Sequence, residues 1–196
     1  MKNSLYYTIV IIFLLGCKRV EPPTALKYDY FPLELGKYKT YQMDSVIYDA
    51  FAESVDSFHY LTKETVDNQY VDNADDTAYR ILIEYSLDSG NSWLFKQYIT
   101  EKRTIYSGQR VENDLRLVKL IFPIKNRRTW DENEMNNKDV QLNRYIQIDR
   151  EQTINNILFD STLTVDQGDE EDPFFRFYGE EIYAKGIGLI SKTYIN

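Results

Sequence analysis

Few residues of this chain have the types and spacing that catalysis requires. The sequence contains one cysteine, Cys17, and one histidine, His59. The alternation of the surrounding residues places His59 with Lys63 and Asp67 on the polar side of an expected strand. General acid–base catalysis needs a partner that orients the histidine, so we interpret His59 as an ordinary surface residue.

Metal sites that lack histidine and cysteine must use oxygen ligands alone. Such ligands are densest in residues 166–173 (DQGDEEDP), which we expect to form a turn. The candidate calcium ligands are Asp166, Asp169, Glu170, Glu171 and Asp172. They lack the fixed spacing of a calcium-binding loop, so a solvated acidic turn is the favoured interpretation, and we predict no cofactor.

Paired carboxylates at Glu180 and Glu181 suggest glycoside hydrolysis at first sight. Adjacent residues of a strand point to opposite faces, so these two carboxylates cannot share a site if the segment is extended. The sequence also contains no glycine-rich phosphate loop and no serine-nucleophile elbow. We therefore predict that the protein is not an enzyme.

Aromatic residues are abundant, with 17 tyrosines, 10 phenylalanines and 2 tryptophans. Four of them, expected on one face of two neighbouring strands, are candidates to line an apolar or glycan-binding cavity: Tyr79, Tyr85, Trp93 and Phe95. The alternative is an aromatic core, which we favour because cross-strand aromatic pairs stabilise such strands.

Antiparallel β structure is predicted for most of the chain. Residues 78–88 alternate most clearly, and 115–122, apolar on both sides apart from two charges, are expected to form a central strand. Further strands are expected at residues 37–48, 57–71, 93–100, 104–111, 140–149, 153–165, 174–184 and 187–195, whereas 123–139 read as an irregular loop. No window carries a helical apolar stripe. The predicted fold is all-β, either a single antiparallel curved sheet or open β-barrel, with a two-layer β-sandwich as the alternative.

The amino terminus carries the clearest targeting signal in the sequence. After Lys2, the apolar run 5–15 fits a signal-peptide core but is too short for a membrane-spanning helix of roughly 20 residues. The run ends in Leu14-Leu15-Gly16-Cys17, which resembles the lipobox of bacterial lipoproteins. That resemblance implies cleavage after Gly16 and acylation of Cys17, which anchors the chain permanently because two or three acyl chains bind together.

Three segments follow from this reading. Residues 1–16 are the signal peptide, 17–27 a lipidated tether with a proline pair, and 28–196 the β domain. The formal net charge is −8, so we expect no nucleic acid partner, since phosphate binding needs clustered lysine and arginine.

Several short motifs together look like a group of envelope lipoproteins, without an agreed activity, common in the Bacteroidota. These motifs are the lipobox, Tyr30-Phe-Pro-Leu33 with Gly36 and Tyr41, Phe122-Pro-Ile124 with Trp130, and Tyr183-Ala-Lys-Gly-Ile-Gly-Leu-Ile190. The resemblance implies an antiparallel β domain on a lipid tether. Because residues 18–21 lack an acidic export run, it favours the periplasmic face of the outer membrane.

Two functions are compatible with these expectations. The first is binding of an apolar or glycan ligand, which a cavity of about 300 Å³ or more lined by the inward aromatics would favour. The alternative is an interaction or accessory subunit of an outer-membrane assembly, contacting an envelope protein partner. A filled core and an exposed apolar patch would favour this alternative.

Overall fold

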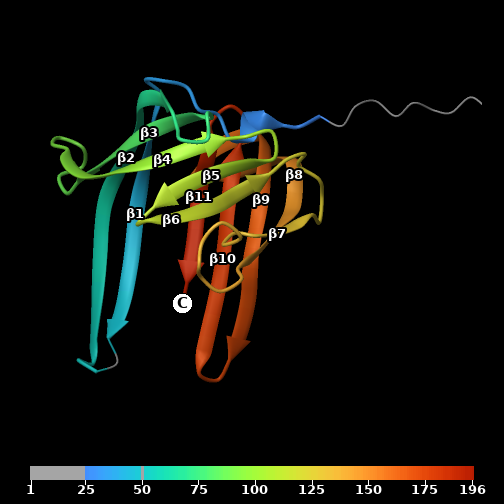
Figure 1. Ribbon diagram of the computed structural model, residues 1–196. Helices are drawn as coiled ribbons and strands as arrows, with labels where there is room; N and C mark the ends of the chain where they lie inside the picture. The colour runs from blue at the N-terminus through green and yellow to red at the C-terminus, as the bar shows by residue number, and fades with distance from the viewer. Residues whose placement is uncertain (1–24, 50) are drawn as a thin grey trace, which may run out of the picture.

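The computed structural model describes residues 25–49 and 51–196, which form an all-β domain (Figure 1). The described elements are η1 (Tyr28–Tyr30), β1 (Tyr38–Asp49), β2 (Ser54–Val71), β3 (Thr77–Ser86), β4 (Leu94–Arg103), β5 (Ser107–Glu112), β6 (Leu115–Ile121), β7 (Thr129–Asp131), β8 (Leu142–Ile154), β9 (Ile157–Asp172), β10 (Phe175–Ala184) and β11 (Gly188–Ile195). The all-β prediction is confirmed. The signal peptide, Cys17 and most of the tether lie outside the described residues.

Two antiparallel sheets build the domain. Sheet A has the order β1-β2-β3-β4-β5-β6 and curls strongly into a half-barrel, and sheet B has the order β11-β10-β9-β8-β7. The sheets meet beyond β6, where the amide of Val118 donates to the carbonyl of Glu132 at 2.9 Å. The fold thus combines the two predicted alternatives, an open barrel-like sheet and a second layer. β1 and β11 remain as the outer strands at the other end.

Turn chemistry explains why consecutive strands pair. Asn113-Asp114 and Asn155-Asn156 each have positive φ at both residues, as the tight turns that match strand twist require. The first turn lies between the strands predicted at residues 104–111 and 115–122, as expected. The second lies later than expected, because β8 continues to Ile154 before it turns.

The predicted acidic turn at 166–173 is wrong. β9 extends to Asp172, and Asp172 pairs with Phe175, so the chain reverses only at residues 173 and 174. Acidic side chains are tolerated along this strand because residues 169–172 are exposed to water.

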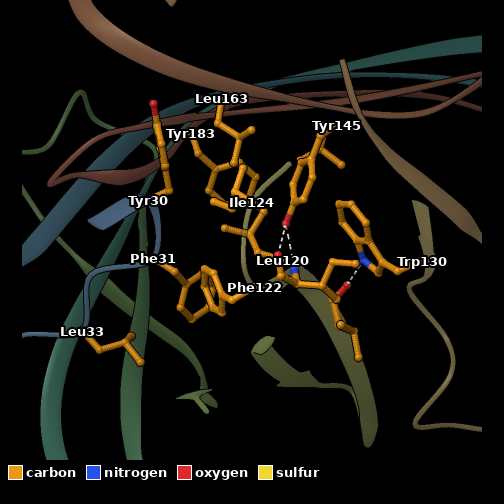
Figure 2. Packing of buried hydrophobic residues seen from close by; sticks show 13 residues of the cluster. Tyr30, Phe31, Leu33, Leu120, Phe122, Ile124, Trp130, Tyr145, Leu163 and Tyr183 are labelled. Atoms are coloured by element: carbon orange, nitrogen blue, oxygen red, sulfur yellow. Dashed lines mark hydrogen bonds between the residues drawn. The ribbon is translucent and has the colours of Figure 1, made fainter. Parts of the chain in front are cut away.

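The larger of two hydrophobic clusters in the described residues lies between the sheets (Figure 2), and the smaller one consists of Ile81, Ile83 and Ile99 in sheet A. Members of the larger cluster come from the segment before β1, from β6 and the following loop, and from sheet B: Tyr30, Phe31, Leu33, Val118, Leu120, Ile121, Phe122, Ile124, Trp130, Tyr145, Leu163, Val165 and Tyr183. Both phenylalanine–proline motifs therefore contribute to the same core. Within this core, the hydroxyl of Tyr145 donates a hydrogen bond to the carbonyl of Ile121 at 2.9 Å. The same hydroxyl accepts a hydrogen bond from the amide of Ile121 at 2.7 Å.

The segment between β6 and β8 differs from its predicted irregular form. It contains β7, which pairs with β8 and buries Trp130 against Tyr145, with ring centroids 4.5 Å apart. Residues 118–121 of β6 are buried as expected from their composition. However, β6 is the last strand of sheet A, not a central one, and the segment containing Trp130 covers it.

Candidate interaction surface

A buried ionic cluster lies where β6, β10 and the segment after β7 meet. The ammonium of Lys119 lies 2.6 Å from carboxylate oxygens of both Glu132 and Glu181. The side-chain amides of Asn143 and Gln167 donate to the other oxygen of Glu132 at 3.0 and 2.9 Å. All five residues are buried, and the ammonium, the two carboxylates and the two amide groups pair with one another. The side-chain oxygen of Asn143 is the exception, because it is buried without a hydrogen-bond partner.

The electrostatics of this cluster favour a structural role. Burial alone would lower the pKa of Lys119, but attraction to Glu181 and Glu132 overcomes it and the pKa is raised. Burial would likewise raise the pKa of Glu181, yet the charges of Lys119 and Lys192 lower it. An amine nucleophile needs a lowered pKa and access to substrate, and Lys119 has neither. The cluster instead links sheet A to sheet B.

A second ionic cluster lies around Arg110 on the side of sheet A that faces the core. The guanidinium contacts Glu64 at 2.7 Å, Glu101 at 3.0 Å and Glu112 at 3.0 Å. Burial would lower the pKa of Arg110, but the neighbouring carboxylates raise it well above its usual range. Because these residues come from β2, β4 and β5, the cluster holds the curled strands together at the root of the β1–β2 hairpin.

Two hairpins extend beyond the sheets in the same direction (Figure 1). We call residues 43–49 and 51–58 of the β1–β2 hairpin arm A, and residues 169–178 of the β9–β10 hairpin arm B. Each tip presents a phenylalanine: Phe51 is 100% exposed and Phe174 is 98% exposed. Neither ring contributes to the core, so both are free to contact another molecule.

Apolar residues are exposed on both faces of arm A. In an antiparallel pair, successive residues alternate between faces, and cross-strand partners share a face. Ser45 faces Phe58 and Ile47 faces Asp56, whereas Tyr48 faces Val55 on the other side. The exposed apolar side chains of the arm are Met43, Val46, Ile47, Tyr48, Phe51, Val55 and Phe58. An isolated hairpin with this composition has no core to bury them.

Both arms are acidic. Arm A contains Asp44, Asp49, Glu53 and Asp56, and the chain has no lysine or arginine between Lys39 and Lys63. Arm B contains Asp169, Glu170, Glu171 and Asp172, with Arg176 as its one basic residue. The exposed aromatic residues thus lie within a negative field, which favours a positively charged partner over an anionic membrane surface.

The four aromatic candidates do not form one site. Tyr79 packs against the core, and Tyr85 meets Tyr60 edge to face at 6.5 Å. Lys63 lies over the ring of Trp93, 4.4 Å from its centroid. Phe95 was expected to point inward with these residues but is 59% exposed.

A β-bulge explains the position of Phe95. Ile83 pairs with Gln97, but Glu84 pairs with Phe95, so Lys96 is an extra residue in β4. One extra residue reverses the alternation between the two parts of the strand that it separates, so Phe95 points to the face opposite to that of Ile99. Strict alternation in the sequence could not reveal this shift.

The acidic candidates for calcium binding do not converge either. Asp166 contacts Arg144, and Asp169 contacts Arg176, so both carboxylates have basic partners. Glu170 and Asp172 lie exposed along arm B. Across residues 25–49 and 51–196, no three histidine, cysteine or acidic side chains are placed to hold a metal ion.

His59 has a partner that its sequence position did not predict. Its Nδ1 lies 2.6 Å from a carboxylate oxygen of Asp44, its cross-strand neighbour in β1. The hydrogen bond with His59 lowers the pKa of Asp44. Both side chains are largely exposed, so the pair lies on the surface of arm A rather than in a pocket.

Three hollows on the surface are lined by residues other than the four aromatic candidates. One groove, of about 500 Å³, crosses the outer side of sheet A and is lined by Asn68, Tyr70, Arg80, Gln97, Tyr98, Ile99, Thr100, Val111, Asn113 and Asp114. The others measure about 610 Å³ beside η1 and about 180 Å³ near Lys102. The four aromatic candidates therefore do not line these hollows.

Comparison with protein-family models, with curated proteins and with solved structures found no match. Within the part of the chain that the structure describes, no helix is long and apolar enough to cross a membrane. The arms, the buried ionic clusters and the groove are accordingly interpreted from the chain's own residues.

Proposed function

We propose that this protein is a lipid-anchored, non-enzymatic interaction module, an accessory subunit of an outer-membrane assembly that contacts an envelope partner through arms A and B. The observation that carries the proposal is the exposure of apolar side chains on both faces of arm A and at both tips. Contiguous exposed apolar residues on a soluble domain mark interaction sites far more often than scattered ones do.

The composition of the arms supports the same function. Fully burying one large apolar side chain contributes about 1.5–3 kcal/mol, so a partner that covers several of these residues gains a substantial driving force. Aromatic residues, which are enriched at interface hot spots, occupy both tips. The surrounding carboxylates keep the free protein soluble and would steer a basic partner towards the arms.

Site-specific photo-crosslinking tests this proposal in intact cells that produce the full chain. A photo-reactive phenylalanine analogue at position 51 or 174 is expected to give crosslinks to one and the same envelope protein, identified by mass spectrometry. Position 106 is the matched control, because Tyr106 is also an exposed aromatic residue but lies in the β4–β5 turn. Equal crosslinking from all three positions, or none from the two tips, would contradict the proposed function.

Anchoring through Cys17 is proposed from the sequence alone. Replacing Cys17 with serine is expected to abolish palmitate labelling and to move nearly all of the protein from the membrane fraction to the soluble fraction. A second acyl chain is what makes such anchoring stable, and serine offers no thiol for acylation. The circular dichroism spectrum of the β domain should stay unchanged, and a serine variant that still labels would refute the lipobox.

The predicted apolar or glycan ligand stays a prediction. The groove on the outer side of sheet A, with Tyr70 and Tyr98 among its lining residues, is one place that could take such a ligand. The arms support the interaction function more directly, because their exposure has no role in the folded domain itself.

A further inference from the structure

The edge strand of arm A lacks most of the features that usually protect an exposed strand edge. β1 is the outer strand of sheet A and pairs with β2 without a register shift from Tyr38 to Asp49. Beyond Lys39 it contains no lysine, no proline and no bulge. Natural edge strands commonly use these devices to prevent another strand from pairing, so β1 is an open template for strand addition.

The hydrogen-bond pattern shows which groups face this open edge. The amide of Val66 donates to the carbonyl of Lys37 at 2.9 Å, which identifies their positions as a hydrogen-bonded pair. Such pairs alternate along an antiparallel ladder. The odd-numbered residues of β1 therefore bond to β2, and the even-numbered residues direct their N–H and C=O groups away from it. Asp44, Val46 and Tyr48 offer these groups within arm A.

Charge decides which strand fits this edge. The four carboxylates of arm A have no lysine or arginine among them, so a strand with regularly spaced basic residues gains favourable contacts. A second copy would bring two sets of these carboxylates together, in a chain whose net charge is already −8. Exposed Val46 and Ile47 lie on opposite faces of the strand, so the incoming strand also needs apolar side chains.

We propose that β1 binds an extended, cationic segment of the envelope partner by β-strand addition, with the partner strand pairing to the even-numbered residues 44–48. This inference rests on the proposed function and specifies how arm A contacts its partner. Main-chain hydrogen bonds supply affinity in this mode, and the alternating side chains of the added strand supply specificity.

Amide hydrogen exchange on the full chain tests the proposal, with an acetylated and amidated decapeptide of alternating lysine and valine as the probe. The peptide is expected to slow exchange at the amides of Asp44 and Tyr48 and to bind more weakly as salt rises. A matched peptide of alternating glutamate and valine should leave these amides unprotected. Lack of protection by the lysine peptide, or equal protection by both, would overturn the proposal.

Proline variants test the edge directly. Val46→Pro removes an amide that points away from β2, so the hairpin keeps its own bonds, and the affinity for the lysine peptide should fall by about tenfold or more. Val46→Thr keeps the amide and a β-branched side chain, so it should bind as the original does. Tyr48→Pro repeats the test at the next outward position in case the first variant folds poorly, and undiminished binding by a folded proline variant would refute strand addition.

The same variants separate this inference from the function on which it rests. If the crosslinks from positions 51 and 174 persist in Val46→Pro, the arms contact a partner but not by strand addition. If those crosslinks are absent in the original chain, the proposed function itself fails. A third outcome, without peptide, is that residues 44–48 become protected from exchange as the protein concentration rises and that sedimentation shows a dimer. That pair of results would mean that a second copy of the chain occupies the edge, and it would overturn the proposal of a cationic partner.

Discussion

Replacing Lys119 with methionine is expected to lower the free energy of unfolding by about 3–5 kcal/mol, measured by urea denaturation. The ammonium lies 2.6 Å from carboxylate oxygens of Glu132 and Glu181, and all three residues are buried. Methionine fills a similar volume but leaves two carboxylates without their counter-ion in the interior. The loss therefore reflects uncompensated charge more than lost packing.

Lys37→Met is the matched control. Lys37 pairs with Glu34 at 2.7 Å, but both side chains are more than half exposed, so this change should alter stability by less than about 1 kcal/mol. A similarly small loss for Lys119→Met would contradict the buried cluster. Replacing Glu132 and Glu181 with glutamine in the Lys119→Met background should recover part of the loss, because a neutral amide needs no counter-ion and its oxygen can still accept from Asn143 and Gln167.

The pH dependence of stability follows from the same cluster. The pKa of Glu181 is lowered in the folded protein from an ordinary value of 4.5, so the unfolded chain binds its proton more readily. The stabilisation from Glu181 is thus present above pH 4.5 and is lost as the pH falls towards the folded-state pKa. Lys119→Met removes the main source of this shift, so its stability should decline less steeply over that acidic range.

Replacing Trp130 with alanine is expected to lower the free energy of unfolding by about 3–5 kcal/mol, as large core truncations do. Trp130 is 6% exposed and packs against Tyr145, and its indole nitrogen donates to the carbonyl of Val118 at 2.7 Å. The change removes a large buried surface and leaves the carbonyl of Val118 without this donor.

Met135→Ala provides the control within the same connecting segment. Met135 is 46% exposed, so its truncation should change stability by no more than about 0.5 kcal/mol. The chemical denaturation midpoint of each variant gives the comparison directly. If both variants lose the same small amount, the segment from β6 to β8 is a surface loop and its packing against β6 is not the source of stability.

The sequence by itself determined the class of fold and most strand positions. Side chains of a half-buried strand alternate with a period of two, and that local rule is legible in residues 78–88 without any tertiary contact. Turn residues such as Asn113-Asp114 are equally local, because positive φ depends on the residue itself. The charge of the arms could also be read from the sequence, although their projection from the sheets could not.

Only the tertiary structure decided which side chains share a surface. The bulge at Lys96 turns Phe95 outward, and a bulge depends on pairing with β3 that no local pattern encodes. Trp130 lies in a polar stretch, yet long-range packing buries it against Tyr145. Lys119 and Glu181 are 62 positions apart in the chain, and their charges are compatible with burial only because the two sheets bring them together. Contacts of this kind depend on the closure of the whole domain, which the order of residues alone does not display.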